Sequence, residues 1–539
     1  MLAHRLRAPK VDGAVLAEPP LEQSASLLRD DAARLDGWDH DFQGRRASVL
    51  RAKVRGEALD AARRYHEGAG LDLPEVDDPA GPIVVTGHQP ELFHPGVWVK
   101  NFAVSGIAEA AGGLALNLIV DNDIPKGAFI RVPDGSSGSL RARLVAFDDW
   151  AGEVPFEDQP IRDERLFASF PGRVRDVLDG RVGRPLLDRF WPAVLDAPAG
   201  MPGRDRVGRR FARARRVVEA GWGVKNWEVP LGDLCETDGF RWFACHLLAQ
   251  LDHYREVHND ALDRYRALYG IRSKNHPVAA LARQGEWVEA PFWAWRQAEP
   301  RRRPLMVRQL ARTMELRIAG DDEPFLELPL TPDREACCAV EALRELPAMG
   351  VRLRTRALTT TMFARSLVGD LFVHGIGGAK YDELGDEIAR GFFGIEPPTF
   401  LTLSMTLHLG LPTPDATAEG LHAVDRKLRD LAWQPERSLN GRGDVASLVA
   451  AKRDLIAQVP ASKADRRARY HLLRKVNAEL AARVDDLRPG LVAEHASIAA
   501  ALHDAAVARS REYSIVLFDE GRIAAAMGDV RRAAGASPG

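Results

Sequence analysis

Short runs of purely apolar residues stand between longer amphipathic stretches early in this chain. Residues 83–85, Ile-Val-Val, predict a strand buried on both faces, because β-branched side chains occupy every position. A helix is expected over 96–111, ended by Gly112-Gly113, and a second strand over 114–120. This order predicts a β-α-β unit with parallel strands and a right-handed connection.

The same order of elements returns in the second half of the sequence. Strands are predicted over 371–373 and 399–407, and 379–392 between them has the spacing of a helix. Two such units are the plan of a doubly wound parallel sheet, so the sequence predicts an α/β fold with a Rossmann-like core. In such a core a ligand binds at the carboxyl ends of the strands, in the crevice where the strand order reverses.

The other stretches predict what is attached to this core. Leu473, Val476, Leu480 and Val484 lie on one helical stripe with charges opposite, which predicts an α-helical coiled-coil region. The expected parts are an N-terminal helical segment (1–80), a first half of the core with a hairpin at 128–147 (81–150), an inserted α+β region (151–350), a second half of the core (351–412), a coiled-coil domain (413–510), and a C-terminal strand at 514–518 with a loose tail (511–539).

Charge and cysteine content narrow the class of protein. Lysine and arginine number 74 against 76 aspartates and glutamates, and this balance gives no electrostatic reason to expect nucleic acid or an anionic membrane as partner. The 4 cysteines form no CxxC pair, as suits a reducing compartment. No apolar run is long enough for a signal peptide or a membrane span, so we expect a cytoplasmic protein that acts on small molecules.

The first predicted strand ends in a polar cluster, Thr86-Gly87-His88-Gln89. Gly87 lets the backbone approach a ligand, the three side chains offer hydrogen bonds, and a helix N-terminus nearby favours an anion such as phosphate. His88 is the candidate acid–base group, because imidazole titrates near neutral pH. A plain strand-to-helix turn with capping residues is the alternative.

The second strand ends in Asp121-Asn122-Asp123, expected at the same edge of the sheet. The two carboxylates can hold Mg²⁺ through water, bind a substrate amine or ribose hydroxyls, or act as a base. An Asx turn, which the same residues favour, is the alternative.

A glycine-rich cluster follows the strand at 371–373. It reads His374-Gly375-Ile376-Gly377-Gly378, and a helix with Lys380 and Tyr381 continues it. Backbone N–H groups of such a turn can bind phosphate. The cluster fits neither GxxxxGK[ST] nor GxGxxG, so a tight structural turn is the alternative.

The region 271–330 differs in composition from its surroundings. Trp293 belongs to a tryptophan-rich run that can form a stacking surface, although core packing is the more common role. Arg301-Arg302-Arg303 can reach an anionic substrate or form a solvated basic patch.

The polar clusters resemble the motifs of one enzyme family. The stretch IVVTGHQPELFHPGVWVKNF is similar to VTGQQxGLFGGPxYxxYK of the bacillithiol biosynthesis cysteine-adding enzymes, which are regarded as cysteine ligases. Val120-Asp121-Asn122-Asp123 stands where that family has EDHD. VHGIGGAKYDEL and PPTFLTLSMTL stand where it has GGPGExAYW and MPVLxPR, so three short motifs follow the same order along most of the chain.

The resemblance implies a Rossmann-like core akin to nucleotidyltransferases and a homodimer formed through the C-terminal helices. It also implies a carbon–nitrogen ligase that joins an amino acid, cysteine, to a sugar-linked small acid of the glucosaminyl-malate type. The carboxylate would be activated by ATP, and ADP and Mg²⁺ are further possible ligands. In that reading the glycine turn and Lys380 bind phosphate, Asp121 or Asp123 binds the amine or ribose, and His88 is the acid–base group.

The chain also departs from the family pattern. His88 replaces the first Gln of the turn, Asn122 replaces the His of the acidic motif, and Val120 replaces its first Glu. Gly378 replaces a Glu and Asp382 a Trp, whereas Gly375, Gly377 and Tyr381 match.

Three functions therefore remain in competition. The first is the ligase-like enzyme. The second is a nucleotide- or metabolite-binding dimer without turnover. The third is a metal-dependent hydrolase that uses His88, His94 and Asp123, although no HxxxH or HxH spacing supports such a site.

Overall fold

The computed structural model describes residues 6–76, 78, 80–136, 138–439 and 445–536. They fall into two units, each of which is described by itself. Unit 1 comprises Met1–Arg131, Leu144–His408 and Arg511–Gly539, and unit 2 comprises Val132–Arg143 and Leu409–Ser510.

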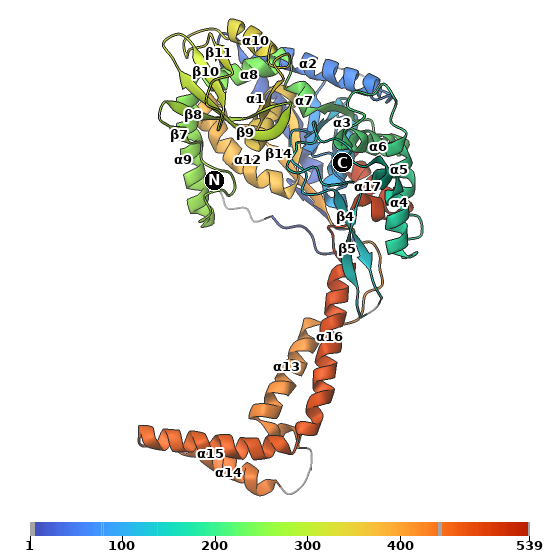
Figure 1. The fold of residues 1–539 in the computed structure, drawn as a ribbon, viewed down its shortest axis with the longest axis vertical. Helices are drawn as coiled ribbons and strands as arrows, with labels where there is room; N and C mark the ends of the chain where they lie inside the picture. Colours follow the sequence, from blue (N-terminus) through green and yellow to red (C-terminus); the bar gives the residue numbers. More distant parts are fainter. Residues whose placement is uncertain (1–5, 77, 79, 137, 440–444, 537–539) are drawn as a thin grey trace. The chain divides into compact units, whose positions relative to one another are not determined.

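A six-stranded sheet, sheet A, forms the centre of unit 1 (Figure 1). Its strands lie side by side in the order β1 (Val15–Glu18), β14 (Phe400–Met405), β13 (Leu371–His374), β2 (Ile83–His88), β3 (Leu114–Ile119) and β6 (Trp227–Pro230). All neighbours from β14 to β6 are parallel, and β1 is an antiparallel edge strand. The protein is thus a mixed α/β protein, and the order of its parallel strands reverses between β2 and β13.

Helices of unit 1 pack on this sheet and around it. They are α1 (Ser24–Asp36), α2 (Ala47–Gly68), α3 (Pro95–Ala110), α4 (Glu164–Leu178), α5 (Leu187–Leu195), α6 (Val207–Gly221), α7 (Leu231–Leu234), α8 (Asp238–Ala249), α9 (Leu251–Tyr269), α10 (Cys337–Arg344), α11 (Ala357–Phe363), α12 (Ile376–Ile388) and α17 (Glu520–Gly535).

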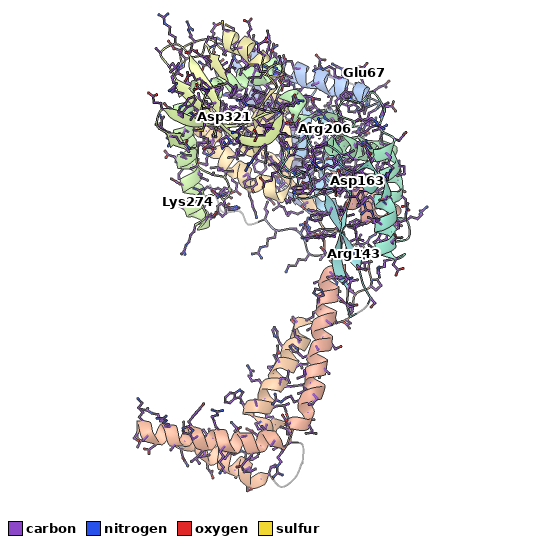
Figure 2. All side chains as sticks on the ribbon, in the orientation of Figure 1. Glu67, Arg143, Asp163, Arg206, Lys274 and Asp321 are labelled. Atoms are coloured by element: carbon purple, nitrogen blue, oxygen red, sulfur yellow. The ribbon has the colours of Figure 1, made fainter. Side chains whose placement is uncertain are left out.

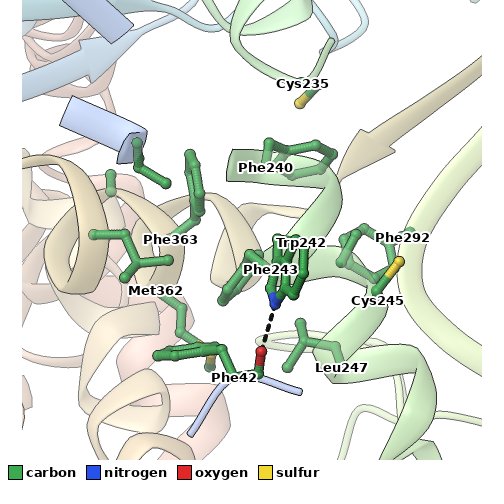
Figure 3. Packing of buried hydrophobic residues seen from close by; sticks show 14 of the residues in the cluster. Phe42, Cys235, Phe240, Trp242, Phe243, Cys245, Leu247, Phe292, Met362 and Phe363 are labelled. Atoms are coloured by element: carbon green, nitrogen blue, oxygen red, sulfur yellow. Dashed lines mark hydrogen bonds between the residues drawn. The ribbon is translucent and has the colours of Figure 1, made fainter. Parts of the chain in front are cut away.

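The largest apolar core lies between sheet A and the helices α2, α8, α11 and α12. The alternate β2 residues Ile83 and Val85 both point into it, as the two-residue period of a strand requires. At its centre Phe363 of α11 packs against Phe240 and Phe243 of α8, with ring centroids 5.4 and 5.1 Å apart (Figure 3). Edge-to-face and tilted aromatic pairs of this kind add to the stabilisation from burial.

A second, antiparallel sheet lies within the region 151–350 and extends to β12. Its strands are β11 (Leu326–Leu328), β10 (Met314–Ile318), β9 (Glu299–Gln309), β8 (Trp287–Arg296) and β12 (Val351–Thr355), with β7 (Arg283–Gln284) also paired to β8. After β10, Asp321 accepts hydrogen bonds from Arg296 at 2.9 Å and from Arg303 at 2.7 Å (Figure 2). Part of the arginine run at 301–303 is therefore used to hold this sheet together.

The two chain ends differ from expectation. Residues 15–18 form β1, because the N-terminal segment covers the free edge of β14. The strand expected at 514–518 is a 3₁₀ turn, Ile515–Leu517, and the tail expected to be loose is α17. Its apolar residues Ile523, Met527, Val530 and Ala534 are buried on one stripe. α17 packs on α3, where Gly106 lets the backbones approach: a Cβ there would lie 2.2 Å from the Arg531 carbonyl oxygen.

Unit 2 consists of helices and most of a hairpin. The helices are α13 (Ala418–Trp433), α14 (Ala446–Ala457), α15 (Lys463–Ala482) and α16 (Arg488–Ala508), and the hairpin is β4 (Phe129–Asp134) with β5 (Arg141–Ala146), as predicted for 128–147. α13 lies beside α16, and Leu431, Leu439, Leu480 and Val484 form a small core (Figure 1). In the part of the chain that the structure describes, no helix is both long and apolar enough to span a membrane.

Candidate functional site

The two polar clusters predicted at the ends of β2 and β13 lie on neighbouring strands. β13 pairs directly with β2, with Val373 opposite Thr86. Residues 86–88 prolong β2 rather than forming a turn, and Thr86 is buried, donating to the Val373 carbonyl at 2.8 Å. Gly87 is equally part of the strand, where a Cβ would approach the Leu118 side chain to 3.2 Å. Thr86 and Gly87 are thus structural residues of β2 that pack against its neighbouring strands. The candidate site is the edge of the sheet at the carboxyl end of β2, beyond these two residues.

His88 is held inside the protein by hydrogen bonds to its own surroundings. Its Nε2 lies 2.9 Å from Asn101 Oδ1 and its Nδ1 lies 3.2 Å from the Gln89 carbonyl oxygen. Burial, together with the charges of Arg215 and Lys100, holds the pKa of His88 well below its ordinary value. The geometry therefore favours a neutral structural residue over the acid–base role expected for His88. A neutral imidazole has one N–H, which donates to Asn101 Oδ1, the nearer oxygen, while the Gln89 carbonyl oxygen lies beside Nδ1.

His374, at the end of β13, has the carboxylate partner that His88 lacks. Its Nε2 lies 2.6 Å from Asp382 Oδ2 on α12. The same carboxylate accepts hydrogen bonds from Thr361 Oγ1 at 2.5 Å and from Arg365 Nη1 at 2.9 Å. We call His374 and Asp382 the dyad.

The protonation of the dyad follows from its surroundings. Burial raises the pKa of Asp382, but His374 and Arg365 outweigh it and lower that pKa to about 2. Burial lowers the pKa of His374 below its ordinary value, although Asp382 opposes this. At neutral pH a neutral imidazole thus donates from Nε2 to an ionised carboxylate, which leaves the lone pair on Nδ1.

Gly378 packs closely against His374 Nδ1. A Cβ on residue 378 would lie 2.7 Å from Nδ1, closer than real contacts allow. No hydrogen bond among the described residues involves this Nδ1. A base with a fixed tautomer and a free lone pair is what proton abstraction from a substrate needs.

Lys100 on α3 brings a buried positive charge to this edge of the sheet. It is 5% exposed, and its Nζ donates to the Gly87 carbonyl oxygen at 3.1 Å. Among the described residues no carboxylate lies within ion-pair distance of Nζ, and burial lowers its pKa to about 8. Its charge also lowers the pKa of His88, His94 and His374, so it lies near all three.

The glycine turn begins α12 without a side-chain cap. Its N-cap residue is Gly375, which has no side chain to accept a hydrogen bond from the first N–H groups of the helix. A Cβ on Gly375 or Gly377 would meet no other atom within 4 Å. The first N–H groups of α12 are thus open to an anionic ligand. Lys380 is exposed on the same helix, whereas Tyr381 is half-buried and packs against the large core.

The acidic cluster after β3 splits into two environments. Asp121 is buried, accepts from the Gly232 backbone at 2.8 Å, and lies 3.5 Å from Arg209. Burial is the main cause that raises its pKa to about 7. Asp123 lies at the surface of a cavity, where it accepts from Gln89 Nε2 at 2.7 Å and pairs with Arg302 at 3.0 Å. Asn122 donates to the Thr355 carbonyl at 2.9 Å.

That cavity, the Asp123 cavity, has a volume of about 320 Å³. It lies where the carboxyl ends of β2 and β3 meet α9, α11 and the second sheet. Its polar walls are formed by Gln89, Asn122, Asp123, Tyr254, His258, Arg302, Thr355, Arg356, Thr359 and Thr360, and its apolar walls by Val120, Val278, Ala279, Leu281, Pro291, Trp293, Ala357 and Leu358. Neither the glycine turn nor Asp121 lines it. The sequence predicted one crevice with both polar clusters in its walls, whereas the structure has two separate candidate places, the dyad and the Asp123 cavity.

Several functional candidates come from the region whose role the sequence left open. Trp293 and Arg302 had been visible as unusual composition, and Lys100 as a lysine within an apolar helix. His94, a candidate metal ligand, caps α3 by accepting from the Gly96 backbone at 3.1 Å. Among the residues with described positions, no three His, Cys, Asp or Glu side chains gather as a metal site.

No protein-family model matches the chain, and no curated protein matches it.

Proposed function

We propose that this chain is a carbon–nitrogen ligase on a Rossmann-like, doubly wound core, which activates a small carboxylic acid and joins it to an amine through an amide bond. The resemblance of its motifs names cysteine as the acid and a glucosaminyl-malate-like compound as the acceptor. The observation that carries the proposal is the dyad, an imidazole paired with a carboxylate at the point where the strand order reverses.

The dyad supplies the proton transfer that amide formation needs. An ammonium group must lose a proton before its nitrogen can attack an activated carboxyl carbon, and Nδ1 of His374 is placed to accept that proton. Asp382 acts as a positioning residue: it fixes the tautomer and stabilises the imidazolium that forms. Gln89 follows β2, the neighbour of β13, and Asp123 lies in the turn after β3, where it is suited to bind an amine.

A nucleotide fits the charges at this edge. Lys100 and the open N–H groups at Gly375 and Gly377 would hold its phosphates, and exposed Lys380 adds a positive charge to the same helix. A bound ATP, with Mg²⁺, supplies the activation of the carboxylate. Lys100 would then have the anionic partner that it lacks among the described residues.

The proposal is tested by incubating the purified protein with ATP, cysteine and glucosaminyl-malate and following AMP, ADP and the amide by mass spectrometry. We expect nucleotide cleavage and amide formation in equal amounts, and we expect His374→Gln to lose both. The control variant is His88→Gln, on the neighbouring strand, which should keep both. Loss of activity in His88→Gln with retention in His374→Gln would show that the dyad is not the catalytic base, and absence of both products would reject this pair of substrates.

We also propose that the helices of unit 2 form a coiled coil through which two copies associate. Ile456, Val459, Tyr470 and Leu472 are large apolar side chains that lie exposed on α14, α15 and the link between them. Association would bury them. Sedimentation equilibrium of the full chain should give a dimer, and Val459→Lys with Leu472→Lys should give a monomer; a wild-type monomer would refute this.

A binding protein without turnover is the second candidate. It is favoured by one observation, namely that His88, the expected acid–base group, is tied to Gln89 and Asn101. Calorimetry with ATP, ADP and AMP decides the matter, because binding without cleavage under the assay above would support this candidate over the ligase.

A further inference from the structure

We propose that the Asp123 cavity binds a small organic acid that has an apolar body and carries a hydroxyl or amino group beside its carboxylate. The inference deepens the proposed function, since it rests on that function for the identity of this molecule as the acid to be joined. The binding itself follows from the cavity alone.

Three residues that line this cavity carry buried polar atoms without partners. His258 Nδ1, the Tyr254 hydroxyl beside Thr359, and Arg302 Nε are all buried and make no hydrogen bond of ordinary geometry among the described residues. Buried polar atoms are satisfied in nearly all proteins, and each one left alone destabilises the fold. Three in the walls of one cavity indicate a ligand that satisfies them.

The chemistry of these atoms specifies the ligand. Arg302 Nε can only donate, so it requires an acceptor such as a carboxylate oxygen. His258 directs Nε2 toward the Ala279 carbonyl at 3.5 Å, which makes Nε2 the protonated nitrogen and leaves Nδ1 as an acceptor. Nδ1 therefore requires a donor, and a hydroxyl or amino group provides one.

The charged groups around the cavity favour an anion at one end. The guanidinium groups of Arg302 and Arg356 lie 5.3 and 4.2 Å from the centre of the Trp293 ring, which fixes their orientation. Arg302 pairs with Asp123, and Arg356 with Glu289 at 2.7 Å. Two arginines, each paired with a carboxylate, thus lie near one indole in the lining of the cavity, and Asp123 is the carboxylate of the lining that can meet an ammonium group.

Size and apolar walls set the body of the ligand. At about 320 Å³ the cavity is at the small end of the range for metabolite sites and is roomy for cysteine. Trp293, Leu281, Pro291 and Leu358 line it. An acid with a branched or aromatic body would fill this space and gain from its burial.

Four probes of one size separate the parts of this proposal. Calorimetry of the full chain, without ATP or acceptor, would use 3-phenyllactate, phenylalanine, 3-phenylpropanoate and phenethylamine. We expect 3-phenyllactate or phenylalanine to bind at least about tenfold more tightly than 3-phenylpropanoate, which lacks the donor. Phenethylamine, which lacks the carboxylate, should not bind. Whichever of phenyllactate and phenylalanine binds more tightly identifies the donor as hydroxyl or amine. Equal binding of all four, or binding of none, would overturn the inference.

Tyr254→Phe locates the binding in this cavity. The variant removes a hydroxyl that has no partner, so the free protein should be at least as stable as the wild type, whereas affinity for the tighter acid should fall about tenfold. Tyr513→Phe removes an equally buried, unpartnered hydroxyl outside the cavity and should change nothing. Equal affinities of the two variants would overturn the inference.

The ligase proposal fails separately. Acid binding that Tyr254→Phe weakens, with no amide formed from any acid, would reject the ligase and leave the cavity assignment. Amide formation that Tyr254→Phe does not affect would reject the cavity assignment alone.

Discussion

Replacing Lys100 by methionine should stabilise the protein and impair its site. Burial lowers the pKa of Lys100 from 10.5 to about 8. Since one pKa unit corresponds to about 1.4 kcal/mol, the buried ammonium destabilises the native state by about 3 kcal/mol at pH 7. Loss of the hydrogen bond to the Gly87 carbonyl destabilises the variant by about 1 kcal/mol, which offsets part of this gain. Lys100→Met should therefore raise the free energy of unfolding by about 2 kcal/mol.

The sign of the pH dependence follows from the same pKa. Between pH 8 and 10.5 the unfolded chain binds a proton at Lys100 that the native state has released, so wild-type stability should rise with pH in this window. Well below pH 8 the difference between variant and wild type should be full, and above pH 10.5 only the lost hydrogen bond should remain, which leaves the variant about 1 kcal/mol less stable. This dependence distinguishes a buried charge from a simple packing effect of methionine.

Urea unfolding of both proteins at pH 7 and 10.5, followed by tryptophan emission, measures this difference. Lys225→Met, at an exposed position, is the control and should shift stability little at either pH. Calorimetry with ATP should show at least about a tenfold loss of affinity in Lys100→Met, because the ammonium is the charge proposed to bind phosphate. A variant less stable than the wild type at pH 7 would refute the reasoning, since Lys100 would then have a stabilising partner in the native protein.

Three other substitutions test the neighbouring groups. Asp382→Asn keeps the size of the side chain but removes the charge that orients His374, so kcat should fall by about 10²- to 10⁴-fold with KM little changed; an unchanged pH–rate profile would contradict this. Gly378→Ala should lower kcat with a smaller effect on the unfolding midpoint, because its Cβ would crowd His374 Nδ1; equal activity would show that Nδ1 does not face substrate. Burial raises the pKa of Asp121 to about 7, so wild-type stability should fall as pH rises from about 4 to 7, by up to about 4 kcal/mol, and urea titrations of Asp121→Asn should lack this fall.

The strands of sheet A could be predicted from the sequence because their pattern is local. Each is a short apolar run ended by polar or glycine residues. The runs at 83–85, 114–120, 371–373 and 399–407 correspond to β2, β3, β13 and β14, although β3 ends at Ile119 and β14 spans only Phe400–Met405. The parallel pairing of β2 with β13 also agrees with the two repeated units. The two edge strands were missed. β1 (Val15–Glu18) and β6 (Trp227–Pro230) are only four residues long, and their positions depend on the distant β14 and β3.

The site was predicted less well because its chemistry depends on partners. From the sequence, His88 and His374 are alike: each ends a buried strand. Only the structure shows that His88 contacts an amide and a carbonyl, whereas His374 contacts a carboxylate. The cavity is harder still, because Tyr254, Trp293 and Arg356 come from a helix, an antiparallel strand and a loop whose mutual register no local pattern encodes.

The departures from the ligase motifs are better explained as one coupled change than as scattered losses. Where the resembling family has Glu and Trp in its glycine turn, this chain has Gly378 and Asp382. Asp382 gives His374 its carboxylate, and Gly378 lacks the Cβ that would lie 2.7 Å from His374 Nδ1. Either change alone would achieve little, since a base needs both a partner that orients it and access to the substrate. Under the proposed function, together they would move the acid–base group from the end of β2 to the end of β13 and leave His88 to serve as a structural residue.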